Sequence, residues 1–326
     1  MTVSTRARRR RAVVLLIALA LVVAGAAAAA LFIGAAQTTG VIITEIRAPR
    51  VALTLIVGAG LGISGALLQG TLRNPLADPG IIGVSASAAL GAVIAVAIGA
   101  AYSSVLAAIG ATVMGLAGIA LVMWIARSSS GRIEVVTIVL GGVAVTAFAA
   151  AVLSVVVAVS DTAGARSATF WTTGSLALAT WPGVWSTLPF LVVAVILAVW
   201  VARHLDVMAL GDRAAWAAGV DVNRTRALAL VAAVLAVSAG VAVVGVIAFV
   251  GLVVPHAVRM LIGPRHGALL IGSALGGALL LIVADTIART VVAPVELPLG
   301  VVTAVIGAPV FVLLLRRTRA AQGGWA

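Results

Sequence analysis

The sequence contains no cysteine and no lysine among its 326 residues. Without cysteine, disulfides and thiolate metal sites are excluded. Without lysine, the chain lacks the residue with which a P-loop binds phosphate, so it carries no standard ATP-hydrolysing motif. If this protein uses ATP, the ATP must be hydrolysed by a partner.

Charged residues of both signs are also scarce, at 9% of the chain, whereas 63% of the residues are hydrophobic. Soluble domains carry about 25% charged residues and could not bury so much apolar surface in one core. The mean hydropathy of +1.28 therefore indicates a protein dissolved in a bilayer. The net charge of +12 comes entirely from arginines that lie between apolar segments, so we do not expect nucleic acid as a partner.

Long apolar runs predict an all-α polytopic membrane protein with one transmembrane domain over residues 1–326. About 20 apolar residues span the hydrocarbon core as a helix. The run 227–255 is too long for one crossing, and Gly245, Gly251 and Pro255 offer places to divide it. The ten predicted spans are 12–34, 51–70, 81–100, 105–126, 135–159, 184–202, 226–248, 249–262, 267–284 and 297–315.

Arginine placement predicts the orientation of these spans. With ten spans and both termini in the cytoplasm, all but four of the 21 arginines face inward, as the positive-inside rule requires. Residues 1–11 then form a basic cytoplasmic N-terminus, 12–34 an uncleaved first span and not a signal peptide, and 203–225 the longest cytoplasmic loop. We therefore predict a multi-pass protein of the cytoplasmic membrane.

The outward-facing arginines need a reason, because they run against the charge rule. Arg47 and Arg50 flank Pro49, which restricts the local backbone, and together they could grip carboxylates of a partner or contact lipid headgroups. Arg289 lies four residues after Asp285, so these two can form a local ion pair, or Arg289 can remain available to a partner. Arg166 is the fourth outward arginine and belongs to no motif.

Glycine motifs in the second predicted span match more than one known pattern, and their position in an apolar helix favours one interpretation over the other. Gly60, Gly62 and Gly65 match the dinucleotide-binding pattern, but they lie inside an apolar helix and do not follow a strand. Gly58 and Gly62 have the spacing at which two membrane helices approach closely, and helix packing is the favoured interpretation.

Two other function classes have a partial signal in the sequence. Ser64 lies in a G-x-S-G motif, typical of an intramembrane serine protease, but such an enzyme needs a histidine base and only His256 lies near a span. We expect Ser64 to bond a backbone carbonyl or to line a pathway. A proton-coupled exporter would need a carboxylate at mid-membrane, and Asp285 lies near an edge. The three histidines lie on separate segments, so no metal site and no cofactor are predicted.

Seven segments carry a resemblance to one family. They are RAPR at 47–50, GLGISGALLQGTLRNPLADPGIIGVSASAALGA at 60–92, TTGSL at 172–176, GDRAAWAAGV at 211–220, FVGLVVPHAVRMLIGPRH at 249–266, ADTIART at 284–290 and ELPLGVVTAVIGAPVF at 296–311. In this order and over almost the whole chain, they resemble the FecCD/BtuC-type permease family, the membrane subunits of ABC importers for iron–siderophores and vitamin B12.

The resemblance implies a non-enzymatic permease subunit that works with several partners. These would be a second permease subunit, identical or paralogous, two cytoplasmic ABC ATPases, an extracytoplasmic substrate-binding protein, and membrane lipids. The expected cargo is a ferric siderophore whose iron stays inside its chelator, and cobalamin or haem is the alternative.

The resemblance also assigns roles to particular residues. It implies docking of the binding protein at Arg47, Arg50 and Arg289. It implies an ATPase coupling loop that contains Asp212, Ala214, Ala215 and Gly219. It implies a pathway and inner gate that contain Ser64, Gln69, Asn74 and Leu76.

Overall fold

The computed structural model describes residues 2–34, 39–126, 135–160 and 168–321, and these residues form helices and loops without a strand. The elements are α1 Thr2–Phe32, η1 Ile42–Arg47, α2 Ala48–Thr71, α3 Val84–Ala97, α4 Val105–Ile125, α5 Val135–Val159, α6 Ala168–Thr173, α7 Trp181–Met208, α8 Asp212–Ala217, α9 Val222–Val244, α10 Val250–Ile262, α11 His266–Thr290 and α12 Leu299–Ala321.

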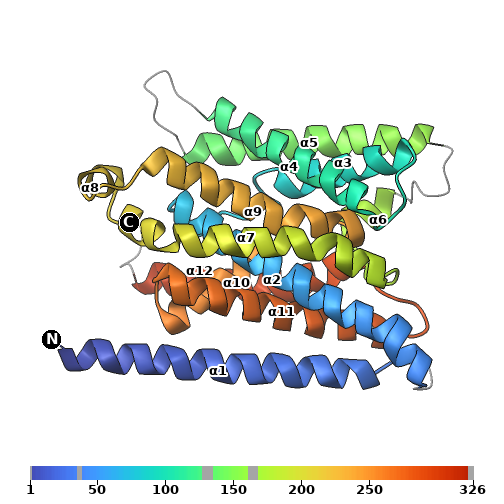
Figure 1. Ribbon diagram of the computed structural model, residues 1–326, viewed down its shortest axis with the longest axis horizontal. Helices are drawn as coiled ribbons and strands as arrows, with labels where there is room; N and C mark the ends of the chain where they lie inside the picture. The colour runs from blue at the N-terminus through green and yellow to red at the C-terminus, as the bar shows by residue number, and fades with distance from the viewer. Residues whose placement is uncertain (1, 35–38, 127–134, 161–167, 322–326) are drawn as a thin grey trace.

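The long helices run side by side along one direction, as expected of a membrane bundle (Figure 1). Seven of them are long and apolar enough to cross a bilayer, and α3, α10 and the apolar part of α12 are shorter. Each of the ten predicted spans therefore coincides with an apolar helix. The short helices α6 and α8 lie at opposite ends of the bundle, and α8 falls within the predicted cytoplasmic loop (Figure 1).

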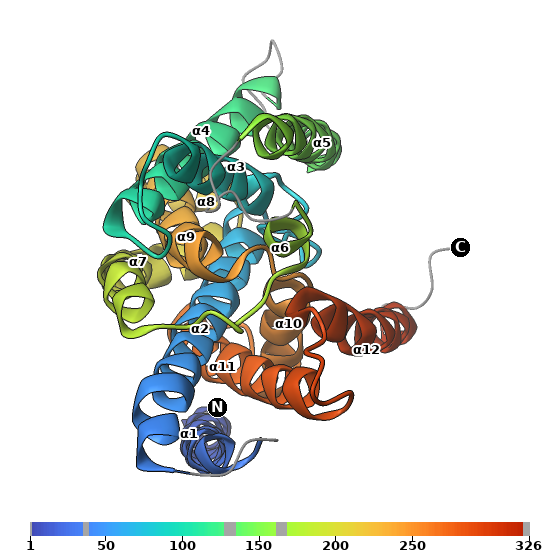
Figure 2. The same cartoon turned by 90° about the vertical axis from the view of Figure 1, so that its right-hand side faces the viewer.

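Helix α2 forms the centre of the bundle and is buried along most of its length. Figure 2 shows it between α7 and α9 on one side and α10 and α11 on the other. The core around it consists mainly of small aliphatic side chains, which allow the helices to approach closely. Helix α1 lies at the edge, where Val23 and Ala30 pack on Ala278 and Ile282 of α11.

The glycines of α2 explain this central position. A Cβ on Gly58 would lie 2.5 Å from the carbonyl oxygen of Gly277, and one on Gly62 would lie 1.9 Å from that of Ser273. The packing role predicted for the Gly58–Gly62 pair is therefore confirmed, with α11 as the partner helix. The dinucleotide-binding interpretation fails, because Gly60, Gly62 and Gly65 all lie within α2 against neighbouring backbones.

The long apolar run is divided over residues 245–249, which include the predicted boundary between 248 and 249 and Gly245, one of the three predicted break points. Helix α9 ends at Val244, and α10 begins at Val250 after Gly245 and Phe249, which both have positive φ. Gly251 and Pro255 lie inside α10 and do not break it. Apolar surroundings require every backbone group to be paired. Here Trp171 accepts from the N–H of Val246, which supports the irregular segment.

Other boundaries differ from the prediction at helix ends. The basic N-terminus continues α1 back to Thr2, and α7 extends to Met208 in the predicted loop. Helix α3 begins at Val84, later than expected, because residues 72–83 form a series of turns.

Candidate functional site

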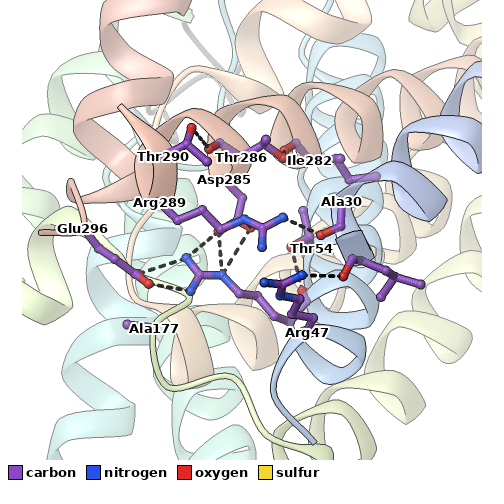
Figure 3. A network of polar contacts seen from close by, with 12 residues as sticks. Ala30, Arg47, Thr54, Ala177, Ile282, Asp285, Thr286, Arg289, Thr290 and Glu296 are labelled. Carbon is purple, nitrogen blue, oxygen red and sulfur yellow. Dashed lines mark hydrogen bonds and ion pairs between the residues drawn. The ribbon is translucent and has the colours of Figure 1, made fainter. Parts of the chain in front are cut away.

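Three of the four arginines predicted to face outward, Arg47, Arg50 and Arg289, form a cluster with Asp285 and Glu296 at the end of the bundle where α2 begins and α11 ends (Figure 3). The Arg50 guanidinium donates to both carboxylates of the cluster. Its Nη1 and Nη2 lie 2.8 and 2.9 Å from the two oxygens of Glu296, and its Nε and Nη2 lie 3.0 and 2.9 Å from Oδ1 of Asp285. This is the bidentate geometry that makes arginine a specific partner for carboxylates.

Two other arginines of the cluster, Arg289 and Arg47, donate hydrogen bonds to the C-terminal end of α1. The Nη2 of Arg289 donates to the carbonyl of Ala30 at 2.6 Å, and the Nη1 of Arg47 donates to that of Leu31 at 2.9 Å. These carbonyls belong to the last turn of α1, where the helix leaves its acceptors without intrahelical donors and carries partial negative charge. The two arginines therefore join the first helix to α2 and α11.

The predicted pairing of Arg289 with Asp285 is confirmed at 3.6 Å between Nε and Oδ2. Arg47 and Arg50 are only 4% and 7% exposed, so in this conformation the arginines face their own chain. Three guanidinium groups and two carboxylates form this cluster, and a third carboxylate, that of Glu45 in η1, lies at the same end of the bundle. The side chain of Glu296 is the accessible part of the cluster, at 36% exposure.

Glu296 was missed as a site residue by the sequence reasoning, although it opens the quoted segment ELPLG. A signal was available, because it is an acidic residue close to outward arginines in a chain with only nine acidic residues. Arg166, the fourth outward arginine, lies outside the described residues.

The predicted coupling loop lies at the opposite end and contains α8. Gly211, with φ of 110°, precedes the helix, and Gly219, with φ of 79°, follows it. Ala214 and Gly219 are exposed, whereas Ala215 is fully buried. Ala215 therefore lies behind the surface that we expected it to form. Trp216, which the sequence reasoning did not select, is 79% exposed there.

Asp212 begins α8 and forms ion pairs with two other parts of the chain. Its Oδ1 lies 2.8 Å from Nη2 of Arg73, and its Oδ2 lies 3.2 Å from Nη2 of Arg226. A second carboxylate holds the same end together, because Oδ1 of Asp206 accepts from the backbone N–H of His266 at 2.8 Å. The two ion pairs thus attach the short helix to the segment that follows α2 and to α9, while the Asp206 bond joins α7 to α11.

The predicted gate residues lie in the α2–α3 link, residues 72–83. The Oδ1 of Asn74 accepts from the N–H of Leu76 at 3.0 Å, which closes a local turn. Leu76 is 42% exposed. Asp78 is 6% exposed, and burial raises the pKa of its carboxyl to about 6, although N–H groups of Gly80 and Ile81 oppose the shift.

Gln69 and Ser64 are buried inside the bundle. The Nε2 of Gln69 donates to the carbonyls of Gly251 and Leu252 at 3.3 and 3.2 Å, so it ties α2 to the start of α10. The Oγ of Ser64 has no hydrogen-bond partner among the described residues, so the carbonyl bond that we expected is not formed. Nor does a histidine contact that hydroxyl, and the protease interpretation lacks its nucleophile–base pair.

The fold and the two ends of the bundle define a class, that of polytopic helical permeases. The family model described as the FecCD transport family matches residues 10–317, and this chain belongs to that family. Its members are membrane subunits of transporters and not catalytic enzymes, and the chain is a multi-pass protein of the cytoplasmic membrane.

Relatives named for different cargoes have similar sequence identity to this chain. The chain is 40% identical over 287 residues to the hemin transport system permease HmuU of Yersinia pestis, covering 86% of this chain and 84% of the relative. It is 42% identical to the cobalamin import system permease BtuC of Halobacterium salinarum, covering 88% and 76%. It is also 42% identical to the Fe(3+) dicitrate permease FecD of Escherichia coli, covering 85% and 86%.

A solved structure has the same architecture. It is described as an inward-facing conformation of a metal-chelate type ABC transporter, is 32% identical, and superposes with a TM-score of 0.81. The match covers 93% of this chain and 99% of that chain.

Proposed function

We propose that this chain is the membrane-spanning permease subunit of an ABC importer that carries a ferric siderophore into the cytoplasm. A second permease subunit would complete the pathway, and two ATPases on the cytoplasmic side would supply the energy. A substrate-binding protein outside would deliver the cargo. The observation that carries this proposal is the separation of the arginine cluster and the exposed helix α8 to opposite ends of the bundle (Figure 1).

At the outer end, the three arginines of the cluster would suit an acidic partner surface. Glu296 is the accessible carboxylate that shares Arg50 with Asp285. A carboxylate of the binding protein could replace Glu296 on Arg50, or bind the cluster from outside. Docking that depends on such charges weakens with added salt, because salt screens exposed charges.

At the inner end, α8 and its neighbours would meet the ATPases. ATP binding would close the two ATPases and move this loop, and the pathway would reorient between its outward-open and inward-open states. No covalent step is required of any side chain in this scheme, and the residues named here bind, pair or pack. The relatives include permeases named for iron, haem and cobalamin, so the experiment must distinguish among these cargoes.

The proposal is tested by uptake in cells with and without the gene. We expect the deletion to lose uptake of ⁵⁵Fe supplied as one ferric siderophore, and the wild-type gene to restore it. Haemin and ⁵⁷Co-cobalamin serve as the other substrates. Loss of either of these with normal iron uptake would show an importer of the alternative cargo, and unchanged uptake of all three would refute the importer proposal.

Docking requires its own measurement, because Arg50 is buried. Arg47→Glu combined with Arg50→Glu should abolish capture of the binding protein by the purified complex, and Arg47→Glu alone, which keeps the Arg50–Asp285 pair, should weaken capture if the double variant does not fold. The same preparations are melted in detergent, so that unfolding is recognised. Glu296→Gln is the control, since it removes negative charge from the cluster and should leave capture intact or strengthen it.

A further inference from the structure

Within the part of the chain that the structure describes, Asp212 is the residue of α8 whose side chain bonds to other segments, namely the turn after α2 and helix α9. Its Oδ1 accepts from Nη2 of Arg73 at 2.8 Å, and its Oδ2 accepts from Nη2 of Arg226 at 3.2 Å. Arg226 belongs to the first turns of α9, which continues directly from the loop that carries α8. Arg73 comes from a distant part of the chain, two residues after the end of α2.

Arg73 is held in an unusual backbone conformation. Its φ is 49°, in the left-handed region that residues other than glycine rarely adopt. This conformation reverses the chain directly after α2. The side chain thereby reaches Asp212, while the next residue, Asn74, begins the link to α3. A single residue thus joins the short helix α8 to the segment that contains Asn74 and Leu76.

The α2–α3 link is held by hydrogen bonds between its own residues, so a displacement of Arg73 would move the residues that follow it. The N–H of Asn74 donates to Gln69, and the N–H of Ala77 donates to Asn74. Further along, the carbonyl of Asp78 accepts from Ile81, and its Oδ1 accepts from Gly80. These successive turns leave few bonds free to absorb a displacement.

We propose that Arg73 is a positioning residue that, through its ion pair with Asp212, transmits movement of α8 to the α2–α3 link. The proposal rests on the proposed function, because it assumes that the ATPases move α8. Movement of the helix would displace Asp212, the ion pair would carry Arg73 with it, and the bonded link would shift as a unit. Opening and closing of the pathway at Asn74 and Leu76 would then follow ATP binding.

The solvent exposure of the Arg73–Asp212 pair distinguishes a role in transmitting movement from a role in stabilising the fold. The side chains of Arg73 and Asp212 are 44% and 45% exposed. Exposed ion pairs contribute little to folding stability, because water and salt screen them. Removing Arg73 should therefore leave the fold and the assembled complex intact, while the connection between α8 and the link is lost.

The experiment compares matched variants in the full complex. The chain is reconstituted in liposomes with its two ATPases and its binding protein, and cargo transported per ATP hydrolysed is measured with the cargo that the wild type accepts. Arg73→Gln should lower this ratio about twofold to fivefold, as expected for loss of one exposed pair, with ATP hydrolysis retained. Arg73→Lys should restore most of it, because a single Nη2 contact carries the bond.

Arg226→Gln is the control, because it removes the other partner of Asp212 and leaves Arg73 in place. It should change the ratio by less than about twofold. Equal losses in Arg73→Gln and Arg226→Gln would overturn the proposal, as would an unchanged ratio in Arg73→Gln. A wild-type complex that transports no iron chelate, haemin or cobalamin would instead refute the proposed function, and this inference with it.

A second readout follows the link itself. Because the sequence has no cysteine, Leu76→Cys introduces a unique thiol into this subunit. Its rate of reaction with a maleimide should change when ATP is added to the complex. Adding Arg73→Gln should abolish that change, whereas adding Arg226→Gln should preserve it. A nucleotide response that survives Arg73→Gln would contradict transmission through this pair.

Discussion

At the scale of single residues, Asp78 shows how burial makes stability depend on pH. Its carboxyl lies in the α2–α3 link beside Gly251, and burial raises its pKa from 3.8 to about 6. The folded state therefore binds the proton more tightly than the unfolded state does. The free energy of unfolding should fall as pH rises from about 4 through about 6, by roughly 3 kcal/mol from this group alone.

Asp78→Asn should remove this dependence. The variant keeps an oxygen that can accept from the N–H of Gly80, and it does not ionise. Its melting temperature in detergent should exceed that of the wild type at pH 7.5, and the two should converge near pH 4. A wild-type protein that melts at the same temperature across this range would show that Asp78 stays charged or becomes hydrated.

Arg50 is the residue whose loss should be most damaging at the outer end. Arg50→Met would leave Asp285 buried without its bidentate partner and would release Glu296. Removing one member of a buried ion pair typically costs about 3–5 kcal/mol. We expect a large drop in melting temperature and in the yield of folded protein.

Glu296→Gln provides the matched comparison. Its side chain is 36% exposed, and the Arg50–Asp285 pair remains in that variant. The melting temperature should change much less than in Arg50→Met. Similar losses in both variants would mean that the cluster acts as one inseparable unit.

At the scale of elements, the position of α2 depends on places where a side chain cannot fit. A Cβ on Gly65 would lie 1.9 Å from the carbonyl oxygen of Gly251, at the start of α10. That atom is backbone, so it cannot turn away as a flexible side chain would. Gly65→Ala must push α10 from α2, together with the bonds from Gln69 to Gly251 and Leu252.

We therefore expect Gly65→Ala to reduce the amount of folded protein and its melting temperature strongly. Gly267→Ala is the control, because nothing lies within 4 Å of the added Cβ and alanine favours the helix. That variant should be as stable as the wild type or slightly more stable. A tolerated Gly65→Ala would show that α10 can shift without loss of the bundle.

At the scale of the whole molecule, the even number of apolar helices predicts that both termini lie on the same side of the membrane, and the arginine distribution predicts that this side is the cytoplasm. Fluorescent and alkaline phosphatase reporters fused after residue 326 should report a cytoplasmic C-terminus, because phosphatase folds actively only outside. The control is a phosphatase fusion in the segment between η1 and α1, near residue 40, which should be active. An active C-terminal phosphatase would instead require an odd number of crossings.

The sequence by itself determined much of this protein. Apolar runs of spanning length predicted all ten apolar helices, because the hydrocarbon core has a fixed thickness and each helix satisfies its own backbone. The quoted motifs were sufficient for the family. Helix geometry also offered the i, i+4 pairing of Asp285 with Arg289 as one of two alternatives, and the structure contains that pair.

Only the tertiary structure decided what the polar residues contact. The pairing of Arg50 with Asp285 and Glu296 joins residues more than 230 positions apart, and no local periodicity encodes such a distance. The break at Gly245 and Phe249 depends on the backbone of Trp171, which supplies an acceptor from another segment. Local rules fix where helices form, whereas long-range packing decides which charges meet and where an irregular backbone finds its partners.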